Sequence, residues 1–200
     1  MDLTRVRQNL LQNGFAVSVF PDAQAAADYI DAAIDGATVG FGGSVTLETL
    51  GLYDRLRTHN RVFWHWRAEN GGRQAAYAGA QTADYYLSSV NALAETGEII
   101  NIDGSGNRVS AIQYGHKKVF LVVGSNKLAP DYDAALFRAR NVAAPLNARR
   151  LGCKTPCAEK GDRCYDCAGP ARICRGLSVL WKKPAGCEYE VVLIDEPLGF

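Results

Sequence analysis

Apolar side chains recur at helical spacing in some stretches of the chain and form short continuous runs in others. Residues 3–13 place leucine and valine side chains on one face of a helix, which Gly14 is expected to end. The FAVSVF run at 15–20 is typical of a strand, and a second helix is expected between Asp22 and Asp35. The chain is therefore expected to begin with a helix, a strand and a helix.

Strands and helices continue to alternate further along the chain. A short apolar run at 37–41 leads through Gly42 and Gly43 to Ser44, which can cap a helix running to about Leu56. Further strands are expected at 61–66, 117–123 and 189–194, and a long helix at 131–150. This alternation predicts an α/β fold with an open, largely parallel sheet flanked by helices.

Size and composition are those of one globular domain. With 200 residues, 48% of them hydrophobic, the chain can bury a core without help from disulfides. Internal repeats and long linkers are absent from the sequence, and the clear compositional shift lies at 152–170. We therefore expect a single domain, residues 1–200, with a cysteine-rich insert at about 152–176.

The N-terminus and the net charge favour neither a membrane nor nucleic acid as partner. The first residues lack the basic and apolar regions of a signal peptide. Apolar runs such as 119–123 are far shorter than the roughly 18 to 20 residues that span a bilayer. A net charge of +1 is too balanced to suggest nucleic acid. We expect a cytoplasmic protein with no nucleic-acid or membrane partner.

Positive charge is concentrated toward the C-terminus. Residues 138–183 contain eleven Lys and Arg against Glu159, Asp162 and Asp166, an excess of eight positive charges. Such an excess favours an anion: a carboxylate or phosphate ligand, or a metal cluster held by thiolates. A basic surface that faces only solvent is the alternative.

Five of the six cysteines lie between Cys153 and Cys174. They could form disulfides, bind zinc or bind an iron–sulfur cluster. In a reducing cytosol, clustered cysteines are more often metal ligands or redox groups than structural disulfides. Metal binding is therefore the favoured interpretation.

The turn GFGGS at 40–44 is the first candidate for ligand binding. Glycines between a strand and a helix let backbone N–H groups approach an anion at the positive end of the helix. The turn matches neither the dinucleotide fingerprint nor the phosphate-binding loop that ends in Gly-Lys-Ser/Thr. The alternative is a tight turn that binds nothing.

The stretch 88–111 is the second candidate, because it places Asn91, Glu95 and Asp103 among glycines and turns. Glu95 could act as general base or nucleophile, with Asn91 polarising an oxygen of the substrate. Ordinary turn and capping roles are the alternative. The histidines show no ligand or triad spacing and are expected to be structural: His59, His65 and His116.

Three stretches resemble the LUD (lactate-utilisation) domain family: 39–52, 84–112 and 117–128. The family is similar in fold to ribose-phosphate isomerases, sugar-phosphate deaminases and CoA transferases, which implies an open α/β sheet with a cleft beside its glycine turns. In that wider group the turns hold phosphate or CoA, and a carboxylate often does the chemistry. The resemblance implies Gly42, Gly43 and Ser44 as the anion loop and Glu95 as the candidate carboxylate.

The cysteine-rich segment departs from plain LUD domains and resembles a cysteine-bearing branch. This resemblance implies four thiolate ligands for a metal: Cys157, Cys164, Cys167 and Cys174. The set contains one Cys-x2-Cys pair, whereas zinc ribbons usually contain two, so we expect a [4Fe–4S] cluster, with zinc as the alternative. Cys187 is expected to be a partly buried hydrophobe, and Cys153 a spare thiol or replacement ligand.

Two functions stay open at this point. The resemblance implies bacterial utilisation of lactate or another small hydroxy acid, with a small anionic metabolite in the cleft. Because no flavin or nicotinamide fingerprint is present, such a role would need a redox partner protein. The alternative is a non-catalytic metabolite-sensing or assembly protein with a structural zinc site.

Overall fold

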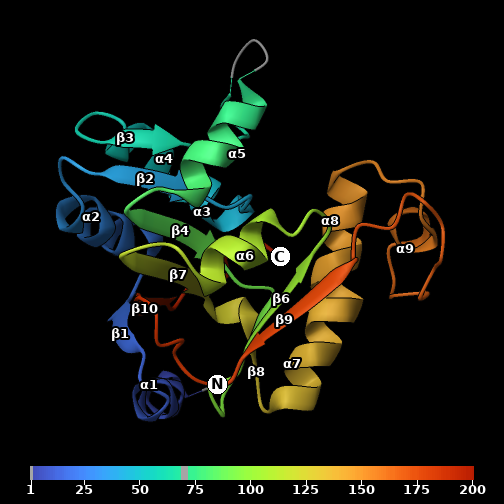
Figure 1. The fold of residues 1–200 in the computed structure, drawn as a ribbon. Coiled ribbons are helices and arrows are strands. Elements are labelled where there is room, and N and C mark those ends of the chain that lie inside the picture. The colour runs from blue at the N-terminus through green and yellow to red at the C-terminus, as the bar shows by residue number, and fades with distance from the viewer. Residues whose placement is uncertain (1, 69–71) are drawn as a thin grey trace.

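The computed structural model describes residues 2–68 and 72–200, and its main sheet has six parallel strands in the order β1-β10-β7-β4-β2-β3 (Figure 1). This confirms the predicted α/β fold with a largely parallel sheet flanked by helices. The strands of this sheet are β1 (Ala16–Phe20), β2 (Thr38–Phe41), β3 (Arg61–Phe63), β4 (Tyr85–Ser89), β7 (Lys118–Gly124) and β10 (Glu188–Ile194).

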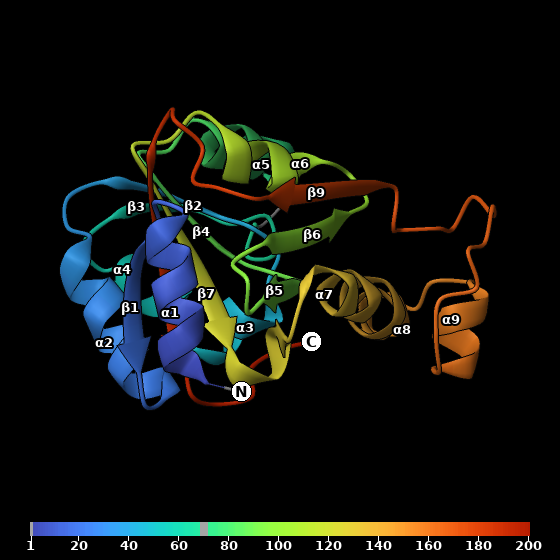
Figure 2. The ribbon, with the colours of Figure 1, turned by 90° about the horizontal axis from the view of Figure 1, so that it is seen from below.

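Helices cover both faces of the main sheet (Figure 2). One face is covered by α1 (Leu3–Gln12), α5 (Arg73–Gln81) and α6 (Asn107–Gln113). The other is covered by α2 (Ala23–Ala33), α3 (Val45–Thr49) and α4 (Leu52–Leu56). In β7, Val119 and Leu121 pack on the first face and Phe120 and Val122 on the second. A strand buried on both faces needs a continuous apolar run, which is why VFLVV was recognisable as a strand.

A second sheet of four strands, in the order β8-β5-β6-β9, lies beside the first. Its strands are β5 (Ala92–Ala94), β6 (Ile99–Asp103), β8 (Leu128–Ala129) and β9 (Gly176–Leu180). β5 pairs parallel to β8 and antiparallel to β6, and β6 pairs antiparallel to β9. The stretch 88–111, expected to be mainly turns, therefore contains the end of β4, the strands β5 and β6, and the start of α6. Its short apolar runs become strands because β8 and β9, distant in the sequence, pair with β5 and β6.

The long helix expected at 131–150 is present and contains one wider π turn. It consists of α7 (Tyr132–Arg138), the π turn η2 (Ala139–Ala143) and α8 (Ala144–Arg150). Asp131 caps its start by accepting a hydrogen bond from the Ala134 N–H. Ala135 and Ala139 pack on β5 and β6 of the second sheet. Pro145 lacks a backbone N–H, which accounts for irregular helical bonding in the preceding turn.

Two predicted elements are shorter than expected. The helix expected at 44–56 is interrupted at Gly51, whose φ of +64° lies in the left-handed region that glycine adopts readily. The strand expected at 61–66 ends at Phe63. Helix α5 and strands β4 and β9 were not predicted.

The cysteine-rich segment projects at the edge of the molecule, beside α8 (Figures 1 and 2). It contains one short helix, α9 (Pro156–Lys160), with loops on either side. Among the helices of the described ranges, none combines the length and apolar composition that a membrane crossing requires.

Candidate functional site

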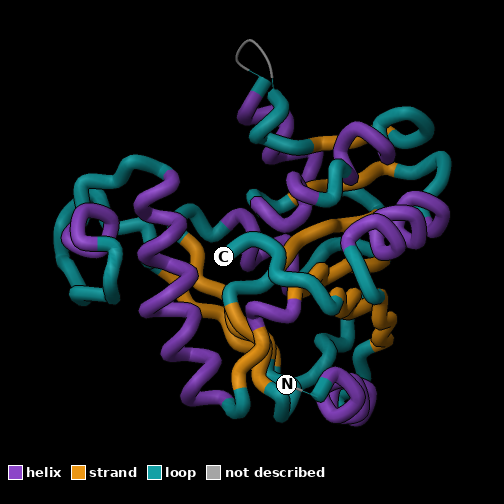
Figure 3. The backbone as a smooth tube through the Cα atoms, turned by 180° about the vertical axis from the view of Figure 1, so that it is seen from behind, coloured by secondary structure: helices purple, strands orange, loops and turns teal. Residues whose placement is uncertain are grey.

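A cavity of about 240 Å³ lies where three main-sheet strands end, facing the long helix. Ser44 follows β2, Ser89 ends β4 and Lys127 follows β7, while Arg150 comes from α8. Phe200 also lines the cavity, and Figure 3 shows the C-terminus between the main sheet and the long helix. Ligands of open parallel sheets bind at the carboxyl ends of strands, so this cavity is the candidate ligand site.

The predicted anion loop reaches this cavity in part. Gly43 and Ser44 line it, but the Gly42 N–H donates to the Leu87 carbonyl at 2.9 Å and is engaged in the sheet. The Ser44 hydroxyl accepts from the Leu47 N–H at 3.2 Å and caps α3. A Cβ at Gly43 would lie 3.1 Å from the indole nitrogen of Trp66, so close packing explains the glycine at this position.

Asn91 and Asp103 also line the cavity, and a buried arginine holds the segment between them. One amino group of Arg108 donates to the Asn91 Oδ1 at 3.0 Å, and the other donates to the Asn101 Oδ1 at 2.9 Å. Asp103 holds the turn before α6, because its Oδ1 accepts from the Ser105 N–H, and its Oδ2 accepts from the Val109 N–H in the first turn of the helix at 3.3 Å. Burial lowers the pKa of Arg108, and the Asp103 carboxylate opposes that shift.

Glu95 lies apart from this group. Strand β5 carries the chain away from Asn91, and the Glu95 carboxylate pairs with the Arg5 guanidinium at 3.1 Å. The Glu95 N–H donates to the Ala129 carbonyl at 2.7 Å. The structure therefore does not bring Glu95 into the cavity with Asn91, and its catalytic role stays an untested prediction.

Lys127 is a cavity residue that the sequence interpretation missed. Its Nζ donates to the hydroxyls of Thr46 and Ser89, at 2.9 and 2.8 Å, and to the Val90 carbonyl at 3.1 Å. The side chain is 4% exposed, and burial lowers the pKa of Lys127 to about 7, with smaller effects from Arg138 and Arg108. A lysine directly after a buried strand was the signal that could have identified it.

Aromatic rings and guanidinium groups line another part of the cavity. His65 stacks on Tyr77, with ring centroids 4.5 Å apart, and burial lowers the pKa of His65 to about 4. Its imidazole is therefore neutral at pH 7. The Arg150 guanidinium lies 4.7 Å from the centre of the Trp66 ring. Arg73 also lines the cavity and hydrogen-bonds to Tyr77.

The other two histidines lie outside the cavity. His59 contacts Asp31 and Asp35, and the hydrogen bond to Asp31 is the main cause of its raised pKa. The ring of His116 stacks on Tyr86, and its Nδ1 lies 2.7 Å from the Ala83 carbonyl. These contacts are those of structural histidines.

The four predicted ligand cysteines line one small cavity of about 10 Å³: Cys157, Cys164, Cys167 and Cys174. All six cysteines, each within the described residues, are free thiols. Cys153 does not line this cavity, and Cys187 packs against the main core. Within residues 2–68 and 72–200, no three His, Cys, Asp or Glu side chains are arranged closely enough to hold one metal ion. Metal binding thus stays a prediction.

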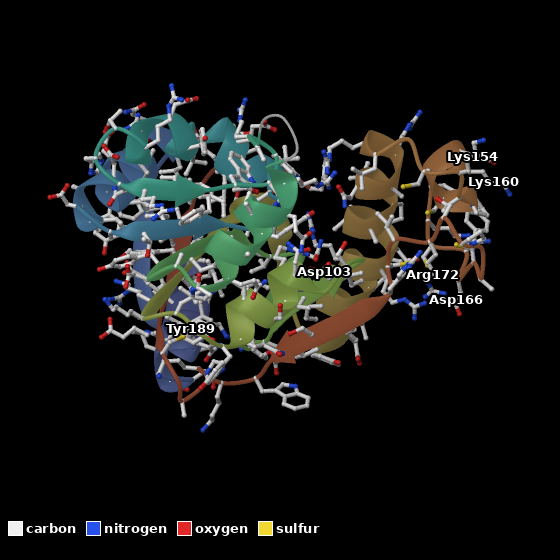
Figure 4. The ribbon with its side chains drawn as sticks, turned by 45° about the horizontal axis from the view of Figure 1, so that its top comes forward. Asp103, Lys154, Lys160, Asp166, Arg172 and Tyr189 are labelled. Atoms are coloured by element: carbon white, nitrogen blue, oxygen red, sulfur yellow. The ribbon has the colours of Figure 1, made fainter. Side chains whose placement is uncertain are left out.

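An ion-pair cluster joins the cysteine-rich segment to the long helix. Asp166, with φ of +45°, contacts Arg140 at 3.2 Å and Arg172 at 3.1 Å. Arg172 in turn donates to the carbonyls of Cys167 and Cys174, both at 2.9 Å. Figure 4 shows Arg172 and Asp166 beside one another, with Lys154 and Lys160 further out.

The two cavities share part of their walls. Ala144, Ile173 and Cys174 line both the larger cavity and the small cysteine-lined one. The Asp166 N–H also donates to the Cys164 sulfur at 3.3 Å. A ligand in the larger cavity would therefore lie beside Cys174, which also borders the cysteine-lined cavity.

The fold and the cavity define an α/β protein with an open parallel sheet and a ligand site at its strand ends. The LUD domain family matches residues 3–194, and the chain belongs to that family. Membership links the chain to lactate utilisation at the level of the family. The chain is also similar to the crystal structure of a DUF162 family protein from Deinococcus radiodurans, with a TM-score of 0.55 at 14% identity. That match covers 96% of this chain and 95% of the other and shows a shared fold. A comparison with curated proteins finds no match.

Proposed function

We propose that this protein acts on a small hydroxy or oxo acid in the larger cavity and carries a [4Fe–4S] cluster on the four clustered cysteines. The observation that carries this proposal is the shared wall, because Cys174 borders both cavities. A substrate bound in the larger cavity would lie beside Cys174, one of the four proposed ligands of the cluster. Family membership supports the choice of substrate class.

The charges of the larger cavity support an anionic ligand. Three guanidinium groups, those of Arg73, Arg108 and Arg150, line it, against the side-chain carboxylate of Asp103. Arg108 is largely buried and donates through both amino groups to side chains and carbonyls of the protein. Arg73 and Arg150 are exposed and use only part of their guanidiniums to donate to Tyr77 and Asn147, so their other N–H groups are available to a carboxylate. A space of about 240 Å³ suits a small metabolite better than a dinucleotide. These residues would bind and orient the acid.

The spacing of the four cysteines, with one Cys-x2-Cys pair, favours a cluster over zinc. Four thiols are a donor set that either metal accepts. In the structure these four side chains line one cavity, so they lie on one side of the cysteine-rich segment where a shared metal group could bind. The Asp166 N–H donates to the Cys164 sulfur, and hydrogen bonds to a ligating sulfur tune the reduction potential of a cluster. When bound, the cluster would supply a one-electron carrier beside the ligand.

Electrons would leave through a partner protein. The outer surface of the cysteine-rich segment is basic, with exposed Lys154, Lys160 and Arg163. A redox partner with an acidic surface is therefore the one that this segment would attract.

The test is anaerobic purification followed by iron and sulfide analysis and a titration with lactate and pyruvate. We expect broad absorbance near about 400 nm, typical of thiolate-bound iron, and a change in that absorbance when either acid binds. The matched control is acetate, which has the carboxylate but neither a hydroxyl nor a carbonyl beside it. A colourless preparation containing zinc would overturn the proposal and support the metabolite-sensing or assembly role instead.

A further inference from the structure

The contacts of Lys127 are unusual for a lysine. Its Nζ is buried at the end of β7 and contacts two hydroxyls and one carbonyl, those of Thr46, Ser89 and Val90. Among the residues that the structure describes, no carboxylate pairs with it, and the charged groups that act on it are the guanidiniums of Arg108 and Arg138. Such surroundings disfavour an ammonium ion and favour the neutral amine.

The hydrogen bonds around Nζ also suit a neutral amine. An amine has two N–H bonds and one lone pair, whereas the ammonium has three N–H bonds. The Val90 carbonyl can only accept, but the hydroxyls of Thr46 and Ser89 can each donate or accept. The amine can therefore donate to Val90 and to one hydroxyl while accepting from the other, so no contact is lost on deprotonation.

We propose that Nζ of Lys127 forms an imine with the carbonyl carbon of a 2-oxo acid in the cavity. The proposal rests on the proposed function for its substrate class, and on the position of Lys127 at the cavity wall, where it contacts two hydroxyls and a carbonyl, for its chemistry. Arg73 and Arg150 line the same cavity and are available to the carboxylate of the acid.

The step is balanced without an oxidant or a reductant. The nitrogen lone pair attacks the carbonyl carbon, and the carbonyl oxygen takes up a proton as the nitrogen loses one. The resulting carbinolamine loses its hydroxyl as water and a second proton from nitrogen, which leaves a carbon–nitrogen double bond. The Thr46 and Ser89 hydroxyls contact Nζ and are placed to relay these protons. Imine formation withdraws electrons from the carbon chain of the acid.

The experiment is reductive trapping on the full wild-type chain. Pyruvate is added with cyanoborohydride, which reduces an imine to a stable secondary amine, and the modified lysine is identified by peptide mass spectrometry. We expect one added pyruvyl group per chain, on Lys127. Lactate has no carbonyl and should give no adduct. Lys127→Arg should lose the adduct, whereas Lys117→Arg, which changes an exposed lysine just before β7, should retain it.

The outcomes separate this inference from the proposed function. If pyruvate binds by calorimetry but Lys127 carries no adduct, the imine is wrong and the proposed ligand class stands. If pyruvate neither binds to the protein nor forms an adduct with Lys127, both the imine and the proposed ligand class are wrong. Adducts spread over surface lysines, with Lys127 no more modified than Lys117, would also overturn the imine.

Discussion

The main sheet and the cysteine-rich segment are stabilised in different ways. In the sheet, Phe120, Val122 and Val192 are fully buried between helices. In the segment, most side chains between Gly152 and Arg175 are partly or fully exposed, and hydrogen bonds and ion pairs attach it to the long helix. Hydrophobic burial stabilises the sheet without a ligand, whereas the segment has little apolar area to bury. The difference teaches that the two regions of one chain rely on different interactions: apolar burial in the sheet, and hydrogen bonds and ion pairs in the segment.

Truncating a core side chain is expected to have the largest effect. Phe120→Ala removes a ring that is completely buried, so the free energy of unfolding should fall by about 3 to 5 kcal/mol. Urea denaturation monitored by circular dichroism measures this change. Cys164→Ser is the matched variant in the other region and should shift the midpoint of the main transition little. Equal losses in both variants would mean that the two regions unfold as one unit.

Replacing a predicted ligand should remove metal without unfolding the sheet. Cys174→Ser should lose most bound iron, because a site with three thiolates holds a cluster poorly. Cys187→Ser should keep its iron, since Cys187 packs on the main core away from the other thiols. Iron analysis per chain checks both variants. If Cys174→Ser keeps its iron and Cys187→Ser loses it, the predicted set of ligands is wrong.

A change in the glycine turn after β2, at the wall of the cavity, should weaken ligand binding. In Gly43→Val the new side chain meets the Trp66 indole and enters the cavity wall, so affinity for pyruvate should fall about tenfold or more. Glu95→Gln should bind pyruvate like the wild type, because its carboxylate pairs with Arg5 outside the cavity. Calorimetric titration measures both affinities. A large loss of turnover in Glu95→Gln would instead support the sequence-based prediction for that residue.

The yield of pyruvate adduct should depend on pH. Because the pKa of Lys127 is lowered to about 7, its reactive amine is largely present above that pH and is lost as the pH falls below it. Trapping at about pH 8 should therefore exceed trapping at about pH 6 by several fold. Mass spectrometry of the Lys127 peptide gives the ratio. A yield that rises only toward pH 10 would indicate an ordinary exposed lysine.

Weakening the ion-pair cluster should have the smallest effect on overall stability. Asp166→Asn keeps a side chain that tolerates left-handed backbone but removes the charge between Arg140 and Arg172. Since this carboxylate is exposed, the free energy of unfolding should change by about 0.5 kcal/mol or less. Iron should nevertheless be lost faster to a chelator than in the wild type. Asp162→Asn, in the same segment but hydrogen-bonded to Tyr165, is the control and should release iron at the wild-type rate.

The buried strands were predictable because their signal is local. VFLVV within β7 and VVLI within β10 are apolar on both faces, a pattern typical of a strand in the middle of a parallel sheet. The four clustered cysteines were likewise visible from their spacing and from the family resemblance. Sequence alone therefore determined the fold class, the family and the set of thiols that line one cavity.

Tertiary structure decided the composition of the ligand site. Asn91 and Glu95 are four residues apart, yet strand β5 separates them, because an extended chain moves a side chain more than 3 Å per residue. Lys127 and Cys174 are far apart in the sequence and become walls of the same cavity only when the second sheet and the long helix pack together. The pKa of Lys127 is lowered to about 7 by burial, and this burial exists only in the folded protein. The sequence determined which side chains are present. Only the folded structure determined which of them lie close together and which are buried, and these two properties set the reactivity of Lys127.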